Sequence, residues 1–288
     1  MQKILQKLEE SYPYLSAGQK KVAQLFFEEP SVIAFSSALE AGKHVNVSES
    51  TVIRLTQKIG YKGYTEAQHM IQRKLAEERW RKIQPENKEL SEDQTFLHNL
   101  LDADIANISK LKETLKEENL LKVVEHISSA RKIYVTSNFF SFGLGHLFVQ
   151  WLNMALDNTE MLMQGDTQYY QQLSKIGEQD LVLALAFPRY TKNIVETVQT
   201  SKLHGATVIS ITDQPDSPVA AYSDLVLEAA MNSNLKIDSF TAALSLLTSI
   251  MRFVSVKDHD KVNKNVQRVE KLYEEKEIFF DSQQANRF

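Results

Sequence analysis

The hydrophobic periodicity of the chain changes once, and this change constrains the fold more than any other feature. Between Leu15 and Leu75 apolar residues recur at helical spacing, with short polar or glycine-containing turns between them. Four short apolar runs rich in β-branched residues follow later, separated by helical segments, at 132–137, 180–187, 206–212 and 224–229. This order predicts an all-α N-terminal domain and an α/β C-terminal domain with a doubly wound parallel sheet.

A length of 288 residues also exceeds what one hydrophobic core usually fills. The first boundary is expected in the polar stretch RKIQPENKELSED, which contains a proline. We therefore predict four parts: a helical domain over 1–80, a linker and helix over 81–125, an α/β domain over 126–256 and a helical tail over 257–288.

Two helical stretches carry apolar rows that must be buried against something. These rows are candidate subunit contacts, and packing on their own domain is an equally good interpretation. The first row is Leu97, Leu101, Ile105, Ile108, Leu111 and Leu115, and the second is Val262, Val266, Val269 and Tyr273.

Charge is distributed unequally along the chain. The net charge is −4, which argues against a surface that is basic throughout, yet residues 1–82 carry thirteen Lys or Arg against nine Asp or Glu. The chain has no cysteine, so disulfides, a thiolate nucleophile and a thiolate zinc site are excluded. We expect no apolar leader and no membrane-spanning run, and hence a cytoplasmic location.

A helix, a tight turn and a second helix are predicted within the N-terminal domain. The first helix spans Ala38 to His44, and the second runs from Glu49 to Ile59 with Ser48 as its N-cap and Gly60 closing it. Val52, Leu55 and Ile59 should face inward. This arrangement is typical of a DNA-binding helix-turn-helix, although a helical bundle with a solvated polar face would give the same pattern.

The outward face of the second helix supplies the candidate DNA contacts. Ser50, Thr51 and Arg54 are expected to reach base edges in the major groove. The cations and hydroxyls that flank the helix would bind phosphates and give salt-sensitive affinity. The full candidate set is Lys43, Ser48, Glu49, Ser50, Thr51, Arg54, Lys58, Lys62 and Tyr64.

Residues 15–78 resemble the N-terminal domain of the RpiR family of bacterial transcription regulators. The resemblance is carried by a proline, a V-S-x-x-T-V-x-R turn and recognition helix, and a G-[FY]-x-G-[FY] ending: Pro30, Val47, Ser48, Thr51, Val52, Arg54, Gly60, Tyr61, Gly63 and Tyr64. It implies that the chain binds double-stranded operator DNA.

Residues 126–256 resemble a sugar isomerase (SIS) domain, the usual partner of this DNA-binding domain in the family. The order of strands and the stretch from Ala206 to Ala229 carry this resemblance. It implies a phosphorylated sugar as effector. In open parallel sheets such ligands bind beyond the carboxyl ends of the strands, where helix N-termini offer N–H groups to anions.

The candidate effector residues lie in two loops and at one helix start. They are Ser137, Asn138, Ser141, Arg189, Tyr190, Thr191, Asp238 and Ser239. For Asp238 and Ser239, capping of the apolar helix that follows is the more common explanation and the one we favour.

Both loops depart from the pattern of sugar-phosphate-binding SIS domains. A Gly- and Ser-rich first loop and an S-x-S-G-x-T second loop are usual, whereas this chain has Asn138, Phe139, Pro188, Arg189 and Tyr190 at these places. Arg189 could pair a phosphate bidentately. Phe139 and Tyr190 could instead fill the pocket.

The sequence offers no catalytic residue, metal site or cofactor. His146 and His204 lie in helical stretches, where packing or surface positions are common, and His and carboxylates do not recur at ligand spacing. Three functions are therefore compared: a metabolite-responsive regulator, an SIS-fold sugar-phosphate isomerase, and a regulator whose SIS domain only oligomerises. We favour the first, acting as a homodimer or higher homo-oligomer that reads paired half-sites away from any membrane.

Overall fold

A computed structural model describes residues 2–82, 94–165, 167–233 and 237–279. Most of the predicted linker, residues 83–93, lies outside these ranges. The chain forms two compact units, and the main division falls after Ala103, within a helix. The smaller unit also includes residues 216–221, 232–233 and 237–238.

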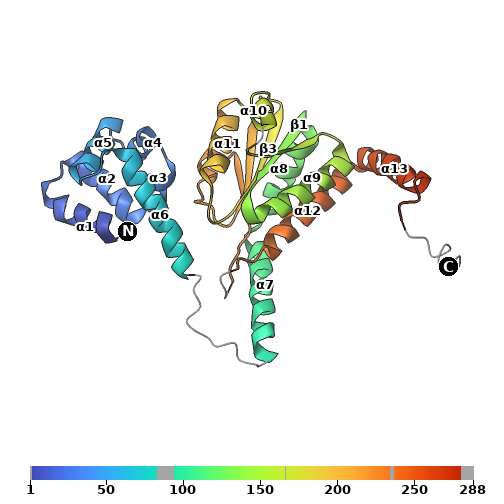
Figure 1. Ribbon diagram of the computed structural model, residues 1–288, viewed down its shortest axis with the longest axis horizontal. Coiled ribbons are helices and arrows are strands. Elements are labelled where there is room, and N and C mark those ends of the chain that lie inside the picture. The colour runs from blue at the N-terminus through green and yellow to red at the C-terminus, as the bar shows by residue number, and fades with distance from the viewer. Residues whose placement is uncertain (1, 83–93, 166, 234–236, 280–288) are drawn as a thin grey trace. The chain divides into compact units, whose positions relative to one another are not determined.

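The N-terminal unit is helical, as the periodicity predicts (Figure 1). Its core is closed by apolar residues that recur along each helix, including Leu8, Phe26, Ile33, Leu55 and Ile71. The elements are α1 (Gln2–Ser11), η1 (Tyr12–Tyr14), α2 (Ala17–Glu28), α3 (Pro30–Phe35), α4 (Ala38–His44), α5 (Glu49–Lys58) and α6 (Tyr64–Lys82).

Local signals in the sequence fix where these helices start. Ser16 and Gln19 form a capping box at α2, and Ser37 and Glu40 form another at α4, so each cap satisfies backbone donors in both directions. Pro30 occupies the first turn of α3, where its missing N–H costs nothing.

The second unit contains a five-stranded parallel sheet in the order β2-β1-β3-β4-β5, which confirms the predicted fold class. Three strands match the predicted runs closely and a fourth lies within its run. Strand β2, TEML, was not predicted, because its four residues carry too short and too polar a pattern. The strands are β1 (Lys132–Ser137), β2 (Thr159–Leu162), β3 (Asp180–Ala186), β4 (Thr207–Thr212) and β5 (Leu225–Glu228).

Helices cover both faces of this sheet. Alternate residues of β3 point to opposite faces, and Leu181, Leu183 and Leu185 join the core formed with α8, α9 and α12. The other face is covered by α10 and α11 (Figure 1). The helices are α7 (Gln94–Thr114), α8 (Glu117–Ser129), α9 (Phe142–Leu156), α10 (Thr167–Leu173), α11 (Lys192–Leu203), α12 (Thr241–Lys257) and α13 (His259–Glu275), with short turns η2 (Phe139–Ser141) and η3 (Ala220–Tyr222).

One segment, Phe139–Leu156, is apolar and long enough to cross a membrane by length and composition alone, which corrects the expectation that no such run exists. It corresponds to η2 and α9. Phe148, Leu152 and Leu156 are buried, and α9 contacts β1, β2 and α13, so the apolarity belongs to a core helix.

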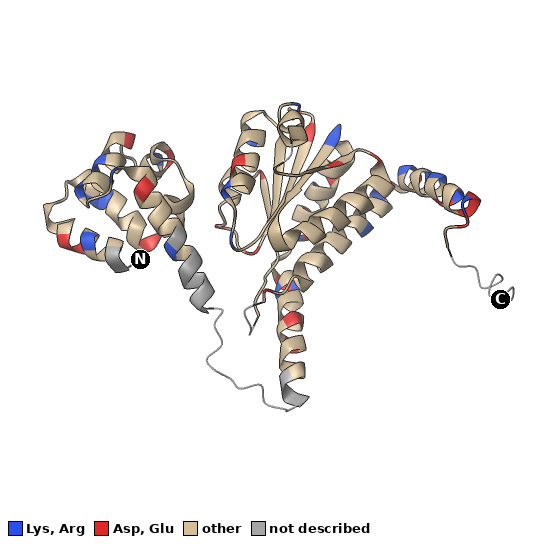
Figure 2. Cartoon of the chain, in the orientation of Figure 1, with Lys and Arg blue, Asp and Glu red and all other residues tan. Residues whose placement is uncertain are grey.

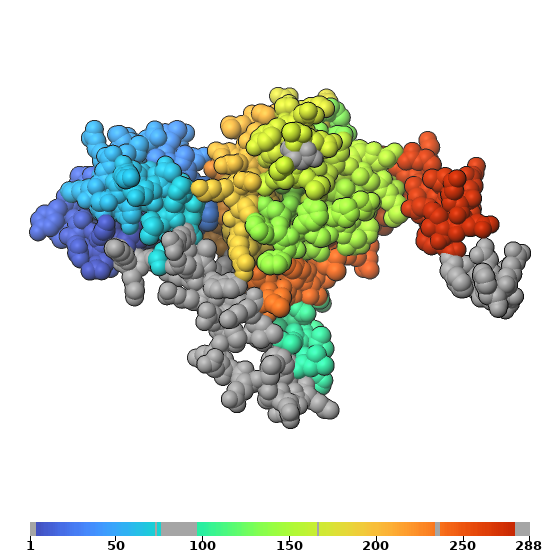
Figure 3. All heavy atoms as spheres, viewed as in Figure 1, coloured from blue at the N-terminus to red at the C-terminus, as the bar shows by residue number. Residues whose placement is uncertain are grey.

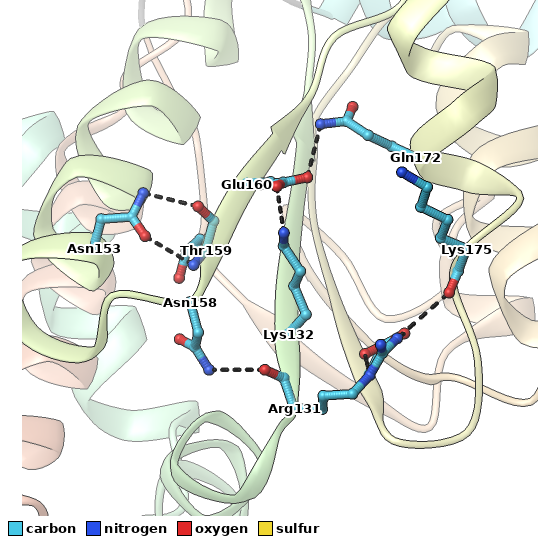
Figure 4. A network of polar contacts seen from close by, with 9 residues as sticks. Arg131, Lys132, Asn153, Asn158, Thr159, Glu160, Gln172 and Lys175 are labelled. Atoms are coloured by element: carbon cyan, nitrogen blue, oxygen red, sulfur yellow. Dashed lines mark hydrogen bonds and ion pairs between the residues drawn. The ribbon is translucent and has the colours of Figure 1, made fainter.

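Polar contacts tie together the amino ends of the strands, opposite the expected effector edge (Figure 4). The Arg131 guanidinium donates to the buried Asp180 carboxylate from Nε at 2.9 Å and Nη2 at 2.6 Å. Lys132 donates to Glu160, which also accepts from Gln172. These bonds compensate carboxylates that the fold partly or fully withdraws from water.

The two predicted apolar rows differ in how far they are buried. Val262 is buried and Val266 packs on the core, so the row of α13 packs at least partly on its own domain. Of the first row, only Leu111 on α7 and Leu115 directly after it contact that core. The remaining four, Leu97, Leu101, Ile105 and Ile108, are exposed by 38% to 60%, and the exposed part of α7 is visible in green in Figure 3.

Candidate DNA-binding and effector-binding sites

Helices α4 and α5 form the predicted helix-turn-helix. The turn between them needs a left-handed residue, and Asn46 supplies it with φ of 55°. Gly42 permits the close return of the chain, because an added Cβ would lie 2.8 Å from the Val47 carbonyl oxygen. Gly60 follows α5 with φ of 86°, so a glycine ends the helix as predicted.

The two faces of α5 are separated as its spacing predicts. Val52, Leu55 and Ile59 are buried in the core of the unit. Arg54 and Lys58 are exposed, as are Glu49 and Ser50. Thr51 is only half-buried, since α2 approaches it closely: a Cβ on Gly18 would lie 3.3 Å from Thr51 Cγ2.

The hydroxyl groups before and within the first turn of α5 bond to one another. Ser48 has the extended backbone of an N-cap, but its side chain makes no capping bond to the backbone. Instead its Oγ lies 3.0 Å from Ser50 Oγ and 2.9 Å from Thr51 Oγ1. Ser48 therefore occupies the predicted N-cap position, but its hydroxyl bonds to side chains and not to the backbone. The three hydroxyl groups form one cluster at the N-terminal end of α5.

The structure changes two of the predicted phosphate contacts. Tyr64 is 7% exposed, and its hydroxyl donates to the carbonyls of Ile33 and Ser36, both at 3.0 Å. Tyr64 is therefore a core residue, and its burial and hydrogen bonds argue against the predicted phosphate contact. The Lys58 amine donates to the Tyr14 carbonyl. Lys43 and Lys62 are exposed, as expected of residues near DNA.

The predicted effector loops meet at the carboxyl ends of the strands, where side-chain bonds join them. The Asn138 amide, after β1, donates to the Thr191 hydroxyl, after β3. Thr191 Oγ1 also accepts from the Ile194 N–H at 3.3 Å and so caps α11 as predicted. The Tyr190 hydroxyl donates to Asp213, after β4. Loops from three adjacent strands are thus connected.

The two serines of the first loop turn inward. Ser141 is 4% exposed, and its hydroxyl contacts the carbonyls of Asn138 at 2.8 Å and Leu185 at 3.2 Å. Ser137 Oγ faces α9, where a Cβ on Gly145 would lie 2.0 Å from it, and it has no hydrogen-bond partner among the described residues. Ser141 therefore supports the loop from within, whereas Ser137 packs against α9.

Bulky residues occupy left-handed backbone positions in both loops. Phe139 has φ of 50° and Arg189 has φ of 67°, conformations that favour glycine. Phe139 and Phe140 are exposed by 75% and 72%, and the Arg189 guanidinium lies 5.7 Å from the Phe140 ring centre. The rim of the site is therefore aromatic and cationic, and Phe139 does not fill a pocket.

Asp238 and Ser239, the predicted residues before α12, differ in their contacts. Ser239 Oγ accepts from the Thr241 N–H at 3.3 Å, which supports the start of α12, and it donates to Asp104 on α7. Asp238 is half-buried in the segment before it.

Sequence reasoning missed Asp104 and Asp213. Asp213 directly follows the apolar run of β4, a position that could have identified it, since carboxyl ends of parallel strands meet at one edge. Asp104 gave no such signal because it meets Ser239 only in the tertiary structure. Among the described residues, no three His, Cys, Asp or Glu side chains gather to hold a metal ion.

Comparison with protein families matches both parts of the chain. Residues 2–78 match the helix-turn-helix domain of the rpiR family, and residues 126–252 match the SIS domain. The chain belongs to the RpiR family. It is a transcriptional regulator, as its relatives are named.

Two curated relatives of this RpiR-family chain illustrate the match. An uncharacterised HTH-type transcriptional regulator of Haemophilus influenzae is 27% identical over 78% of this chain and 78% of its own length. The Escherichia coli regulator HexR is 22% identical over 98% of each chain.

Solved structures share the RpiR-family fold. The sugar isomerase domain of an RpiR transcription factor from Sphaerobacter thermophilus superposes with a TM-score of 0.59 at 21% identity, covering 62% of this chain and 99% of that one. Vibrio vulnificus NanR, solved with ManNAc-6P, gives 0.63 at 18% identity over 94% and 97% of the two chains.

Proposed function

We propose that this regulator binds operator DNA through α5 and controls sugar or amino-sugar metabolism in response to a phosphorylated sugar held by its SIS domain. The observation that carries the proposal is the exposed polar face of α5, with Arg54 and the hydroxyl cluster beside it, on the same chain as an SIS sheet. Arginine and hydroxyl groups are the side chains that read base edges.

Support for a phosphorylated effector comes from the edge of the sheet. Arg189 places a guanidinium in the loop after β3, next to the start of α11, and both features favour an anion. Asn138 and Thr191 would exchange their mutual bond, and Tyr190 its bond to Asp213, for bonds to the ligand. The bound ManNAc-6P of NanR belongs to that protein, and it makes amino-sugar phosphates the first compounds to test.

The exposed apolar row of α7 supports a homodimer or higher homo-oligomer. Leu97, Leu101, Ile105 and Ile108 would leave water in a subunit contact, and two paired helix-turn-helix units would read two half-sites. Effector binding would then change the spacing of the DNA-binding units. A monomer mass from light scattering at micromolar concentration would contradict this part of the proposal.

An SIS-fold isomerase is the second candidate, favoured by the Asp213 carboxylate at the strand ends. A recognition helix has no use in an isomerase, which is why we place regulation first and propose that the protein is not an enzyme. A regulator acting on chromosomal DNA would work in the cytoplasm.

The DNA-binding part is tested by selection from a pool of randomised duplexes. We expect the wild-type protein to enrich a defined sequence, and we expect Arg54→Ala to weaken binding to it by about 5- to 150-fold while the melting temperature stays unchanged. Arg252→Ala removes the same charge from the exposed surface of α12 and is the matched control. Failure of the wild-type protein to enrich any sequence would overturn this part.

The effector part is tested by thermal shift against phosphorylated sugars, amino-sugar phosphates and sugar acids. We expect one compound to stabilise the wild-type protein and the Arg252→Ala control, but not Arg189→Ala. Stabilisation retained by Arg189→Ala would place the ligand elsewhere. A panel without any stabilising compound would favour a second domain that only oligomerises.

A further inference from the structure

The end of η1 and the start of α2 lie beside α5 at two points. Lys58, in the last turn of α5, donates to the backbone carbonyl of Tyr14. At the other end of α5, Thr51 approaches α2 so closely that a Cβ on Gly18 would lie 3.3 Å from it. Residues 14–18 therefore run alongside the helix that is assigned to the major groove.

This segment is held by its own anchors. Leu15 is buried, and Tyr12 packs against the core of the unit with Lys20 above its ring at 5.4 Å. Ser16 caps α2, and the Leu15 N–H donates to the Tyr12 carbonyl at 3.2 Å. Tyr14 lies between these anchors and is 77% exposed. A large side chain on a fixed backbone loses little conformational entropy when it binds a partner.

We propose that Tyr14 is a second DNA contact, which binds the sugar–phosphate backbone beside the groove that α5 enters, and that Lys58 positions it. A phenol hydroxyl donates readily to a phosphate oxygen, and such contacts fix the register of a protein on a duplex. Basic side chains of α2 and α5 lie on the same unit (Figure 2), which favours a polyanion over an apolar partner. The inference rests on the proposed function, since it requires α5 to bind DNA.

The test compares Tyr14→Phe with wild type on two duplexes: the sequence enriched by the wild-type protein and a mixed sequence of equal length. We expect binding to both to weaken by about 5-fold or more, because a phosphate contact carries no sequence information. The slope of affinity against salt should stay unchanged, because a phenol releases no counterion. Tyr170→Phe alters an equally exposed tyrosine on α10 and should bind as wild type.

A double-mutant cycle tests the role of Lys58. If this lysine positions Tyr14, then Tyr14→Phe should cost much less in a Lys58→Met background than in the wild-type protein. If Tyr14→Phe bound both duplexes with wild-type affinity, while Arg54→Ala still weakened binding, the inference about Tyr14 would be overturned and the proposed function would stand. If the wild-type protein enriched no sequence from the randomised pool, the proposed function itself would be overturned.

Discussion

The Ser239 hydroxyl, just before α12, donates a hydrogen bond to the Asp104 carboxylate on α7. The same oxygen accepts from the Thr241 N–H, so one side chain joins the start of a core helix to the helix that carries the exposed apolar row. We expect Ser239→Ala to lower the free energy of unfolding by about 1 kcal/mol, as loss of a helix-start bond does. Urea denaturation measures this difference.

Ser255→Ala is the matched control for that change. Among the residues that the structure describes, the Ser255 hydroxyl bonds only to the Met251 carbonyl within α12, an interaction that gives a helix little stability. Equal unfolding free energies for the two variants would show that the Ser239 bonds contribute nothing.

Phe139→Gly should stabilise the protein. Phe139 is largely exposed and has φ of 50°, so glycine removes strain of about 1 kcal/mol and loses little packing. Phe140→Gly alters an equally exposed neighbour whose φ is not positive, and it should lower the melting temperature. If both variants melted at lower temperature than the wild-type protein, the left-handed strain at Phe139 would be refuted.

Asp180→Asn should destabilise the second unit by about 1 to 3 kcal/mol. The Asp180 side chain is fully buried and accepts two bonds from Arg131 and one from the Gly177 N–H. In Asp180→Asn the side-chain NH₂ group would face these N–H donors without an acceptor between them. Chemical denaturation gives the value. Glu125→Gln breaks an exposed pair with Lys257 and should have little effect; an equal loss in both variants would contradict the role of burial.

Asp224 should make stability depend on pH in the acid range. Burial raises its pKa, but hydrogen bonds from Lys202 and the Val208 N–H outweigh burial, and the pKa lies below its ordinary value. A lowered folded-state pKa contributes stability above the unfolded pKa of about 3.9, and this contribution is lost as pH falls through the folded pKa. The difference in unfolding free energy between wild type and Asp224→Asn should therefore shrink below about pH 4.

Lys202→Met provides the second arm of that experiment. It removes the amine that stabilises the Asp224 carboxylate, so the unfolding free energy of this variant should fall less between pH 5 and pH 3 than that of the wild-type protein. An unchanged acid dependence would assign the effect to another carboxylate.

Patterns between near neighbours in the sequence determined the helix-turn-helix, four of the strands and the cap of α11. The spacing of Val52, Leu55 and Ile59 identifies the buried face of α5, and β-branched runs identify strands that are buried on both faces, because both patterns follow from the period of the backbone. The resemblance to the RpiR family added the proposed type of effector, which spacing alone does not specify.

Only the tertiary structure decided which polar groups remain available. Tyr64 and Lys58 are both predicted phosphate contacts, yet the first bonds the carbonyls of Ile33 and Ser36 and the second bonds the Tyr14 carbonyl. Asp104 meets Ser239 across 135 positions, and the side chains of Leu97, Leu101, Ile105 and Ile108 remain exposed in the single chain although their spacing predicts burial. The sequence determines which residues share a face, whereas long-range packing determines what that face meets.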